Sequence, residues 1–392
     1  MSENKNLNEQ TPVENKPEAK LPLTKKQIGI IGGIAGAVVV LIVVLALVLG
    51  GGNKPAPTPT PDTGDNGTTV TDAEYKLGLG LVFGDITASQ TNATIATVVT
   101  DKDGKIVACK IDCVQNKYSF GETVTFTVLE SKKELGNRYN MAAYGTPNYG
   151  DTVLEWFEQA AAFENFVVGM TVAQVEDLGK EENLQLVNNH WISKDENLLK
   201  AGCTIQIGEF VAAVVKACND EQGMSFKTSS TFTLGLGVNS SDNGTTGDDF
   251  EATVKMNVDF AATVVADGKI LAALNDACQP QLDVVDGTDA SNISVGKGAD
   301  ILKTKRELKE DYKMAAYGAP NVEGGTVKEW YIQSAAFSNY VVGLTSAEVA
   351  GLETQLVNNH YISTDSDLLG AGCTMQITGI MDVVVEAIAN AK

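Results

Sequence analysis

The only two histidines of the chain end two nearly identical polar segments. One segment reads QLVNNHWIS and the other QLVNNHYIS, so His190 and His360 each follow a pair of asparagines. Because an imidazole changes protonation state near neutral pH, each histidine is a candidate proton donor or hydrogen-bond partner for a ligand, together with Asn189 and Asn359. The alternative is structural, since Asn-rich turns bond their own backbone and the histidine would then fix the turn.

A Gly-Cys-Thr segment follows each histidine segment. It places Gly202 before Thr204 in one copy and Gly372 before Thr374 in the other. We expect each segment to open a terminal helix, at 210–218 or 380–388, where free backbone amides attract phosphate and glycine permits close approach. The threonines are therefore candidate phosphate contacts. The alternative is that they cap the helix.

Four aromatic residues are candidates to offer a flat face to a ligand ring: Tyr144, Trp156, Tyr317 and Trp330. The alternative for each is core packing. The sequence contains no Gly-x-Ser-x-Gly, His-Glu-x-x-His or Walker segment, and it has no paired Cys-x-x-Cys or His spacing for zinc. We therefore assign no catalytic residue and no metal ligand, and a binding or electron-carrier module is favoured over a turnover enzyme.

Matching segments occur twice in the same order, so the sequence predicts two tandem copies at 75–221 and 231–392, joined by a linker. Each copy opens with LGLG, continues through a β-branched run, a turn and GKI, and then shows KKEL or KREL followed by MAAYG. Alternating β-branched residues around the glycine turn predict a hairpin, and apolar spacings of three and four after MAAYG predict a helix. Thr171 with Gln174, and Thr345 with Glu348, have capping-box spacing. The expected fold is α+β, a small antiparallel sheet with helices on one side, present twice.

The six cysteines sort by copy. Cys203 and Cys373 are equivalent, and Cys113 matches Cys278 within one residue, whereas Cys109 and Cys218 occur only in the first copy. This pattern gives three candidate disulfides, Cys113–Cys203, Cys278–Cys373 and Cys109–Cys218, in an oxidising compartment. The alternative is six small buried hydrophobic residues.

An apolar run at 28–49 would rise about 33 Å as a helix, enough to cross a bilayer once. Lys25 and Lys26 precede it, so we expect 1–27 to be a cytoplasmic tail and everything after the run to be extracellular. A cleaved signal peptide is the competing interpretation. The Pro-, Thr- and Gly-rich stretch 50–72 is then a stalk that lifts the repeats off the membrane.

The charge of the chain narrows its partners. The net charge is −21, and the first 27 residues hold five lysines and four acids, a net +1, which leaves −22 on the remainder. A surface this acidic repels nucleic acid and anionic lipid headgroups. We expect the membrane helix to be the membrane contact, a flavin or other small ligand to be the soluble partner, and no nucleic acid to bind.

The strand, the Gly-Lys-Ile turn exit and the late Gly-x-Thr segment together resemble the FMN-binding domain family of extracytoplasmic electron-transfer proteins. The resemblance implies an FMN site in each copy, with Gly202, Thr204, Gly372 and Thr374 at the phosphate. In that family a transferase attaches FMN to the Thr of Asp-x-x-(Ser/Thr)-Gly-Ala-(Ser/Thr). Here Leu198 and Leu368 replace the Asp, and Ala201 and Ala371 replace the first Ser/Thr, so the attachment motif is incomplete.

Two hypotheses follow. In the first, the protein is a membrane-anchored extracellular flavin-binding or electron-transfer module with one site per repeat. In the second, it is a non-catalytic cell-envelope protein whose degenerate repeats no longer carry flavin and instead bind a partner or serve a structural role. Fold alone does not decide between them.

Overall fold

The structure is a computed structural model. It describes residues 72–392 except 85, 88, 249–250, 286–292, 296–301 and 324. The predicted tail and membrane anchor, and the predicted stalk up to its last residue, lie outside the described residues. Among the described helices, none combines the length and the apolar character needed to span a membrane.

The first half of the folded unit is one antiparallel sheet with helices on one face. Its strands, in the spatial order β4-β3-β2-β1-β7, are Thr125–Val128, Ile106–Ser119, Gln90–Asp101, Ala73–Phe83 and Met224–Thr228. The stretch expected to be a linker between the copies therefore contributes β7, which pairs with β1. The predicted hairpin is confirmed as β2–β3.

The helical segments of the first half follow β4. They are α1 Lys132–Leu135, the 3-10 helix η1 Gly136–Tyr139, α2 Met141–Tyr144, α3 Trp156–Phe166, α4 Val172–Leu178, η2 Glu181–Asn183, α5 Glu196–Lys200 and α6 Gly208–Cys218. A small hairpin, β5 Leu184–Val187 and β6 His190–Ser193, lies between η2 and α5. The predicted capping box at Thr171 and Gln174 is confirmed at the start of α4.

The second half resembles the first in its element order, but β9 and β13 are additional strands, and among the described residues no 3-10 helix directly precedes its small hairpin and no strand follows its last helix. Its strands are β8 Thr233–Asp242, β9 Thr246–Gly247, β10 Glu251–Ala266, β11 Lys269–Cys278, β12 Gln281–Val285, β13 Ile293–Val295 and the hairpin β14 Thr354–Val357 with β15 His360–Ser363. Its helices are α7 Lys305–Leu308, η5 Lys309–Tyr312, α8 Met314–Tyr317, α9 Trp330–Tyr340, α10 Ser346–Ala350, α11 Ser366–Gly370 and α12 Thr378–Asn390. The prediction of an α+β fold with antiparallel sheets is confirmed.

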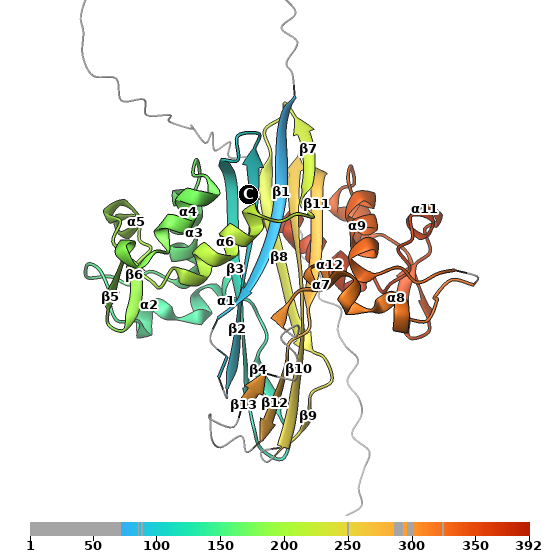
Figure 1. Ribbon diagram of the computed structural model, residues 1–392, viewed down its shortest axis with the longest axis horizontal. Helices are drawn as coiled ribbons and strands as arrows, with labels where there is room; N and C mark the ends of the chain where they lie inside the picture. Colours follow the sequence, from blue (N-terminus) through green and yellow to red (C-terminus); the bar gives the residue numbers. More distant parts are fainter. Residues whose placement is uncertain are drawn as a thin grey trace, which may run out of the picture. The chain divides into compact units, whose positions relative to one another are not determined.

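The two sheets pack face to face, with the helices of each half on the outer faces (Figure 1). One hydrophobic cluster lies between the sheets and combines both halves, including Leu77, Ile95, Val114, Phe260 and Leu274. Two further clusters lie between each sheet and its own helices. A fourth cluster also joins the halves, where Tyr118 packs with Val254 and Met256. The molecule is therefore a four-layer arrangement in which the halves share apolar packing between the sheets.

The LGLG segments have a packing role. Leu77 and Leu79 enter the core between the sheets, while Gly78 and Gly80 face helix α6. A Cβ on Gly78 would lie 2.0 Å from the carbonyl oxygen of Ala217, so only glycine lets the helix lie directly on the strand. The same alternation occurs in β8 against α12.

None of the six cysteines, all of which lie in the described residues, forms a disulfide. The pairing of Cys278 with Cys373 is wrong, because the first lies in the core between the sheets and the second lies under the helices of the other face. The residue match behind that pairing also fails: Asp112 corresponds to Asp276, and the position of Cys113 is held by Ala277. Cys113 and Cys203 share one core cluster, and Cys109 lies near Cys218, as thiols.

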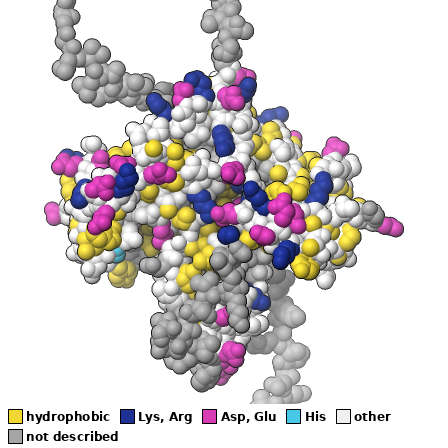
Figure 2. Space-filling model, in the orientation of Figure 1, with side chains coloured by type: hydrophobic (Ala, Val, Ile, Leu, Met, Phe, Trp, Pro, Cys, Tyr) yellow, Lys and Arg dark blue, Asp and Glu magenta, His cyan; other side chains and the backbone are white. Residues whose placement is uncertain are grey.

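Acidic and basic side chains are interspersed over the visible face of the molecule (Figure 2). The surface ion pairs include Lys102 with Asp103 and Lys200 with Glu196, whose side chains are mostly exposed. Such pairs contribute little to stability.

Candidate functional site

The three polar segments that the sequence repeats meet at one place in each half. The paired asparagines form the turn of hairpin β5–β6, with positive φ at Asn188 and Asn189, as a tight two-residue hairpin requires. The side-chain amide of Asn188 donates to the carbonyl oxygen of Pro147, and that of Asn148 donates to the carbonyl oxygen of Thr204. The hairpin, the turn after MAAYG and the Gly-Cys-Thr loop are thus joined by hydrogen bonds.

The second half repeats these bonds residue for residue. Asn358 donates to Pro320, and Asn321 donates to the carbonyl oxygen of Thr374. The glycine after each MAAY turn, Gly145 in the first half, has no room for a Cβ because Val153 and the carbonyl of Met141 lie beside it. The loops are therefore held in one fixed arrangement, which frames a cavity.

The cavity of the first half, site 1, has a volume of about 240 Å³. It is lined by Asn92, Thr94, Lys132, Met141, Gly145, Thr146, Asn148, Val153, Trp156, Gln159, His190, Thr204, Ile205, Gln206, Glu209 and Phe210.

The cavity of the second half, site 2, has a volume of about 670 Å³. All sixteen positions that line site 1 have a counterpart in the lining of site 2: Asn257, Asp259, Lys305, Met314, Gly318, Ala319, Asn321, Val327, Trp330, Gln333, His360, Thr374, Met375, Gln376, Gly379 and Ile380. Two independent cavities built from the same positions identify this location as the candidate site.

A buried lysine stands at the base of each site. Lys132 is 7% exposed, and its ammonium lies 5.2 Å from the ring centroid of Tyr139 and 5.3 Å from that of Trp156. Lys305 is 9% exposed and sits at the same distances from Tyr312 and Trp330. Burial acts to lower the pKa of Lys132, but the neighbouring groups of Cys113, Tyr139 and Glu209 outweigh it and keep the pKa raised.

Neither lysine belongs to an ion pair among the described residues. Cation–π contacts with the flanking rings supply part of the compensation for burying the charge. Because a buried cation normally requires an anionic or hydrogen-bonding partner, the ammonium group is available to bind the acceptor atoms of a ligand in the cavity.

The predicted ligand residues divide into two groups. His190, His360, Thr204 and Thr374 line the two sites, and so do the aromatic candidates Trp156 and Trp330. The remaining predicted residues lie outside the lining: Tyr144, Tyr317, Asn189, Asn359, Gly202 and Gly372. Tyr144 is 84% exposed and Tyr317 is 82% exposed, so these rings point into solvent rather than over a ligand.

The threonines do not stand at the helix start as expected. Helix α6 begins at Gly208, its N-cap is Ile207, and the N-cap of α12 is Ile377. The amide of Thr204 is bonded instead to the side-chain oxygen of Gln159, and Gln333 holds Thr374 in the same way. Helix capping by these threonines is therefore wrong. Each threonine lines the cavity from a loop that the hydrogen bond to the glutamine side chain holds in place.

The residues that sequence reasoning missed are the buried lysines, the glutamines, Asn92 and Asn257, and the carboxylates Glu209 and Asp259. A usable signal existed for the lysines, because KKEL and KREL keep one lysine in both copies. Because this lysine was interpreted as part of a charged helix start, its side chain was expected to be exposed to solvent. Ser131 and Thr304 cap these short helices and turn the lysine inward.

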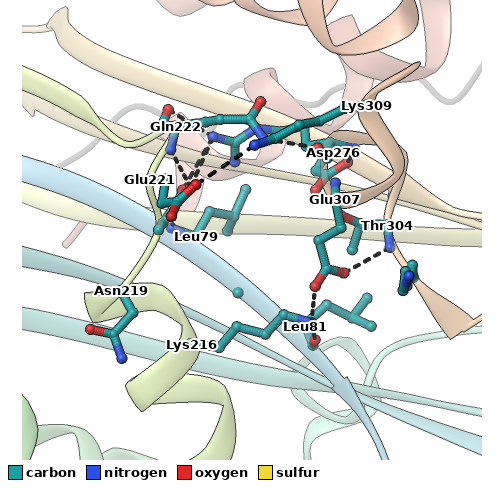
Figure 3. A pocket seen from close by; sticks show the side chains of 14 residues that line it. Leu79, Leu81, Lys216, Asn219, Glu221, Gln222, Asp276, Thr304, Glu307 and Lys309 are labelled. Carbon is teal, nitrogen blue, oxygen red and sulfur yellow. Dashed lines mark hydrogen bonds and ion pairs between the residues drawn. The ribbon is translucent and has the colours of Figure 1, made fainter. Parts of the chain in front are cut away.

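A third cavity lies where the halves meet and is lined by charged residues (Figure 3). Arg306 contacts Asp220, Lys216 pairs with Glu307 at 2.7 Å, and Lys309 pairs with Glu221 at 3.6 Å. Each of these charges already has a partner across the junction. The arrangement therefore links the halves and offers a ligand few unpaired groups.

No protein-family model, characterised protein or solved structure matches this chain.

Proposed function

We propose that this protein is a tandem duplication of a small ligand-binding domain and that each half binds one planar, polar-edged small molecule, with noncovalent FMN as the leading candidate. One observation carries the proposal: the same sixteen positions line a cavity in both halves. A hydrophobic core does not require a buried lysine, two asparagines and a glutamine at equivalent places.

The chemistry of the lining favours a ring with polar edges. Trp156 and Trp330 provide aromatic surface, while Lys132, Lys305 and the pocket glutamines provide hydrogen-bonding groups. Ligand sites commonly combine apolar walls with a few placed polar groups. His190 and His360 are exposed in the hairpin and line the cavities, so they are available to a phosphate group on the ligand.

The attachment of the ligand is noncovalent in this proposal. Thr204 is 7% exposed, and its hydroxyl lies 3.3 Å from the side-chain oxygen of Gln159. The flavin-transferase motif is also incomplete in both copies. The threonine is therefore assigned to the wall of the site rather than to a covalent bond.

The setting of these sites is proposed from the sequence. A single apolar run at 28–49 would anchor the chain with its N-terminus in the cytoplasm and both halves outside the membrane. A flavin held there suits electron transfer at the cell surface. The protein would act as a carrier or binding module rather than as an enzyme with turnover.

Flavin titration of the full-length protein tests the proposal. We expect two FMN molecules to bind per chain. Quenching of flavin fluorescence on binding gives this stoichiometry. Lys132→Met and Lys305→Met should each remove one binding site, and the double variant should remove both. Lys102→Met is the matched control, because that side chain is 74% exposed and lines neither site.

Two results would contradict the proposal. Binding of neither FMN nor riboflavin by a folded wild-type chain would leave the envelope-protein hypothesis. Two sites that persist in the double lysine variant would place the ligand elsewhere in the molecule.

A further inference from the structure

The carboxylates in the two sites come from different places in the chain. In site 1 the carboxylate is Glu209 on helix α6. Site 2 is lined by Asp259 on strand β10 and also by Asp382 on helix α12, and Asp259 is the one that an asparagine holds as in site 1. The register of the sheets makes Thr94 the counterpart of Asp259, and the sequence makes Gly379 the counterpart of Glu209. Both sites therefore contain a carboxylate held by an asparagine, but a helix carries it in the first half and a strand carries it in the second.

The space around these residues has changed in step. In the first half Glu209 lies over Gly84, where a Cβ would lie 1.9 Å from its carboxylate oxygen. In the second half the counterpart of Gly84 is Ser241, and Gly379 leaves room for Asp259, whose Oδ2 would lie 3.0 Å from a Cβ at that glycine. Ser241 also lines site 2, whereas Gly84 does not line site 1.

Both carboxylates are fixed by the same kind of bond. The amide of Asn92 donates to Oε2 of Glu209 at 2.7 Å, and that of the equivalent Asn257 donates to Oδ2 of Asp259 at 2.6 Å. No hydrogen bond within the described part of the chain uses the other oxygen of either group. Each of these two carboxylates thus lines its cavity together with a buried lysine and keeps one oxygen that no described group bonds.

We propose, on the basis of the proposed function, that Glu209 and Asp259 recognise a hydrogen-bond donor of the ligand that lies beside an acceptor bound by Lys132 or Lys305. A cyclic imide edge, as in flavins and other pyrimidine-dione rings, has this pattern, with N–H next to C=O. The carboxylate accepts the N–H bond and the ammonium donates to the carbonyl. The alternative role, neutralising the buried lysine, requires no contact with the ligand.

The test compares riboflavin with 3-methylriboflavin, in which a methyl group replaces the imide hydrogen. Affinities are measured by fluorescence titration of the full-length wild type, Glu209→Gln, Asp259→Asn and the double variant. Because a hydrogen bond to a charged group is strong, methylation should weaken wild-type binding by about tenfold or more. In the double variant, riboflavin should bind about tenfold more weakly and the methylation penalty should fall below about threefold.

Two further variants sharpen the test. Glu196→Gln is the matched control, because its side chain is 75% exposed, and it should behave as wild type. The pair Thr94→Asp with Glu209→Gly transplants the arrangement of site 2 into site 1. It should keep both the riboflavin affinity and the methylation penalty of site 1.

The outcomes separate the two proposals. If the wild type binds riboflavin but the amide variants keep its affinity and its full methylation penalty, the carboxylates do not contact the ligand and this inference fails alone. If a folded wild-type chain, checked by circular dichroism, binds neither probe, the flavin site fails and this inference fails with it.

Discussion

The guanidinium group of Arg306, from the second half, lies 3.2 Å from a carboxylate oxygen of Asp220, from the first half, and the two side chains are only 7% and 9% exposed. Arg306 also donates to the carbonyl oxygen of Gln222, and Asp220 also accepts from the amide of Leu79. The pair therefore joins the end of helix α6, strand β1 and helix α7 into one buried network.

Removing one member of this pair should destabilise the fold strongly. Arg306→Met leaves Asp220 as an uncompensated buried charge, and the expected loss is about 3–5 kcal/mol in the free energy of unfolding. Chemical denaturation measures it. Lys309→Met is the control, because its exposed pair with Glu221 should contribute under about 1 kcal/mol. Equal effects from the two variants would show that the buried network is not a stabilising contact between the halves.

Adding one methyl group to the LGLG strand should be severe. A Cβ on Gly235 would lie 1.8 Å from the carbonyl oxygen of Ala387, which is backbone and cannot rotate away. Gly235→Ala should therefore separate α12 from β8 and lower the melting temperature or prevent folding. Gly208→Ala is the matched control, because a Cβ there meets no atom within 4 Å. A Gly235→Ala protein as stable as wild type would refute this packing account.

Stability should depend on pH through Glu386. Burial, together with the charges of Glu134 and Asp112, raises the pKa of Glu386 to about 7. Since its folded pKa is above the usual value near 4.3, the protonated form is favoured on folding, and this contribution is present at acidic pH and lost as pH rises through about 7.

Basic and polar groups surround Glu386, and a variant of Glu386 itself tests its part in the pH effect. Lys133, Lys392 and Lys110 line the same cavity, and Asn390 bonds to the carboxylate. Glu386→Gln should raise the melting temperature at pH 8 and flatten its pH dependence between 5 and 7. An unchanged slope in that variant would assign the pH dependence to another group.

Loss of the site lysines should separate binding from stability. Replacing Lys132 by Met removes a charge that its neighbours favour, as the raised pKa shows, together with two cation–π contacts, so we expect a modest loss of about 0.5–2 kcal/mol in the free energy of unfolding. Ligand binding in that half should be lost. Thermal melting without ligand measures the first effect and flavin titration the second. A strongly destabilised Lys132→Met protein would instead make the lysine a structural residue.

The six cysteines should all react as thiols. Denaturation without reductant in the presence of an alkylating agent should add six groups per chain, as measured by intact mass. A product with four additions would show one disulfide, and the pair Cys109–Cys218 would be the first to map, since Cys218 perturbs the pKa of Cys109.

Local features of the fold followed from the sequence because they depend on neighbouring residues. The β2–β3 hairpin, the capping boxes of α4 and α10 and the left-handed asparagines are all encoded within a few positions. The face-to-face sheets were not predicted, because a strand such as β1 is apolar on both faces and its pattern does not name its partner. The strand register was also unknown from the sequence, and Cys113 and Cys278 therefore looked equivalent although Cys113 corresponds to Ala277.

The site was predicted in part. His190 and Thr204 were identified because both copies keep them, and the structure places both in the lining of site 1. Glu209 and Asp259 were missed because repeat comparison looks for the same residue at the same position. A carboxylate that moves from a helix to a strand is visible only when side chains are placed in space.

The shared core between the sheets also bears on how the chain is made. During synthesis the first half is complete before β8 of the second half emerges, so the apolar face that carries Leu77, Ile95 and Val114 has no partner at that stage. Exposed apolar sheet faces attract other chains. The apolar face of a nascent first half therefore stays exposed until the C-terminal half covers it, unless it pairs with another molecule. We expect an isolated half to form a dimer.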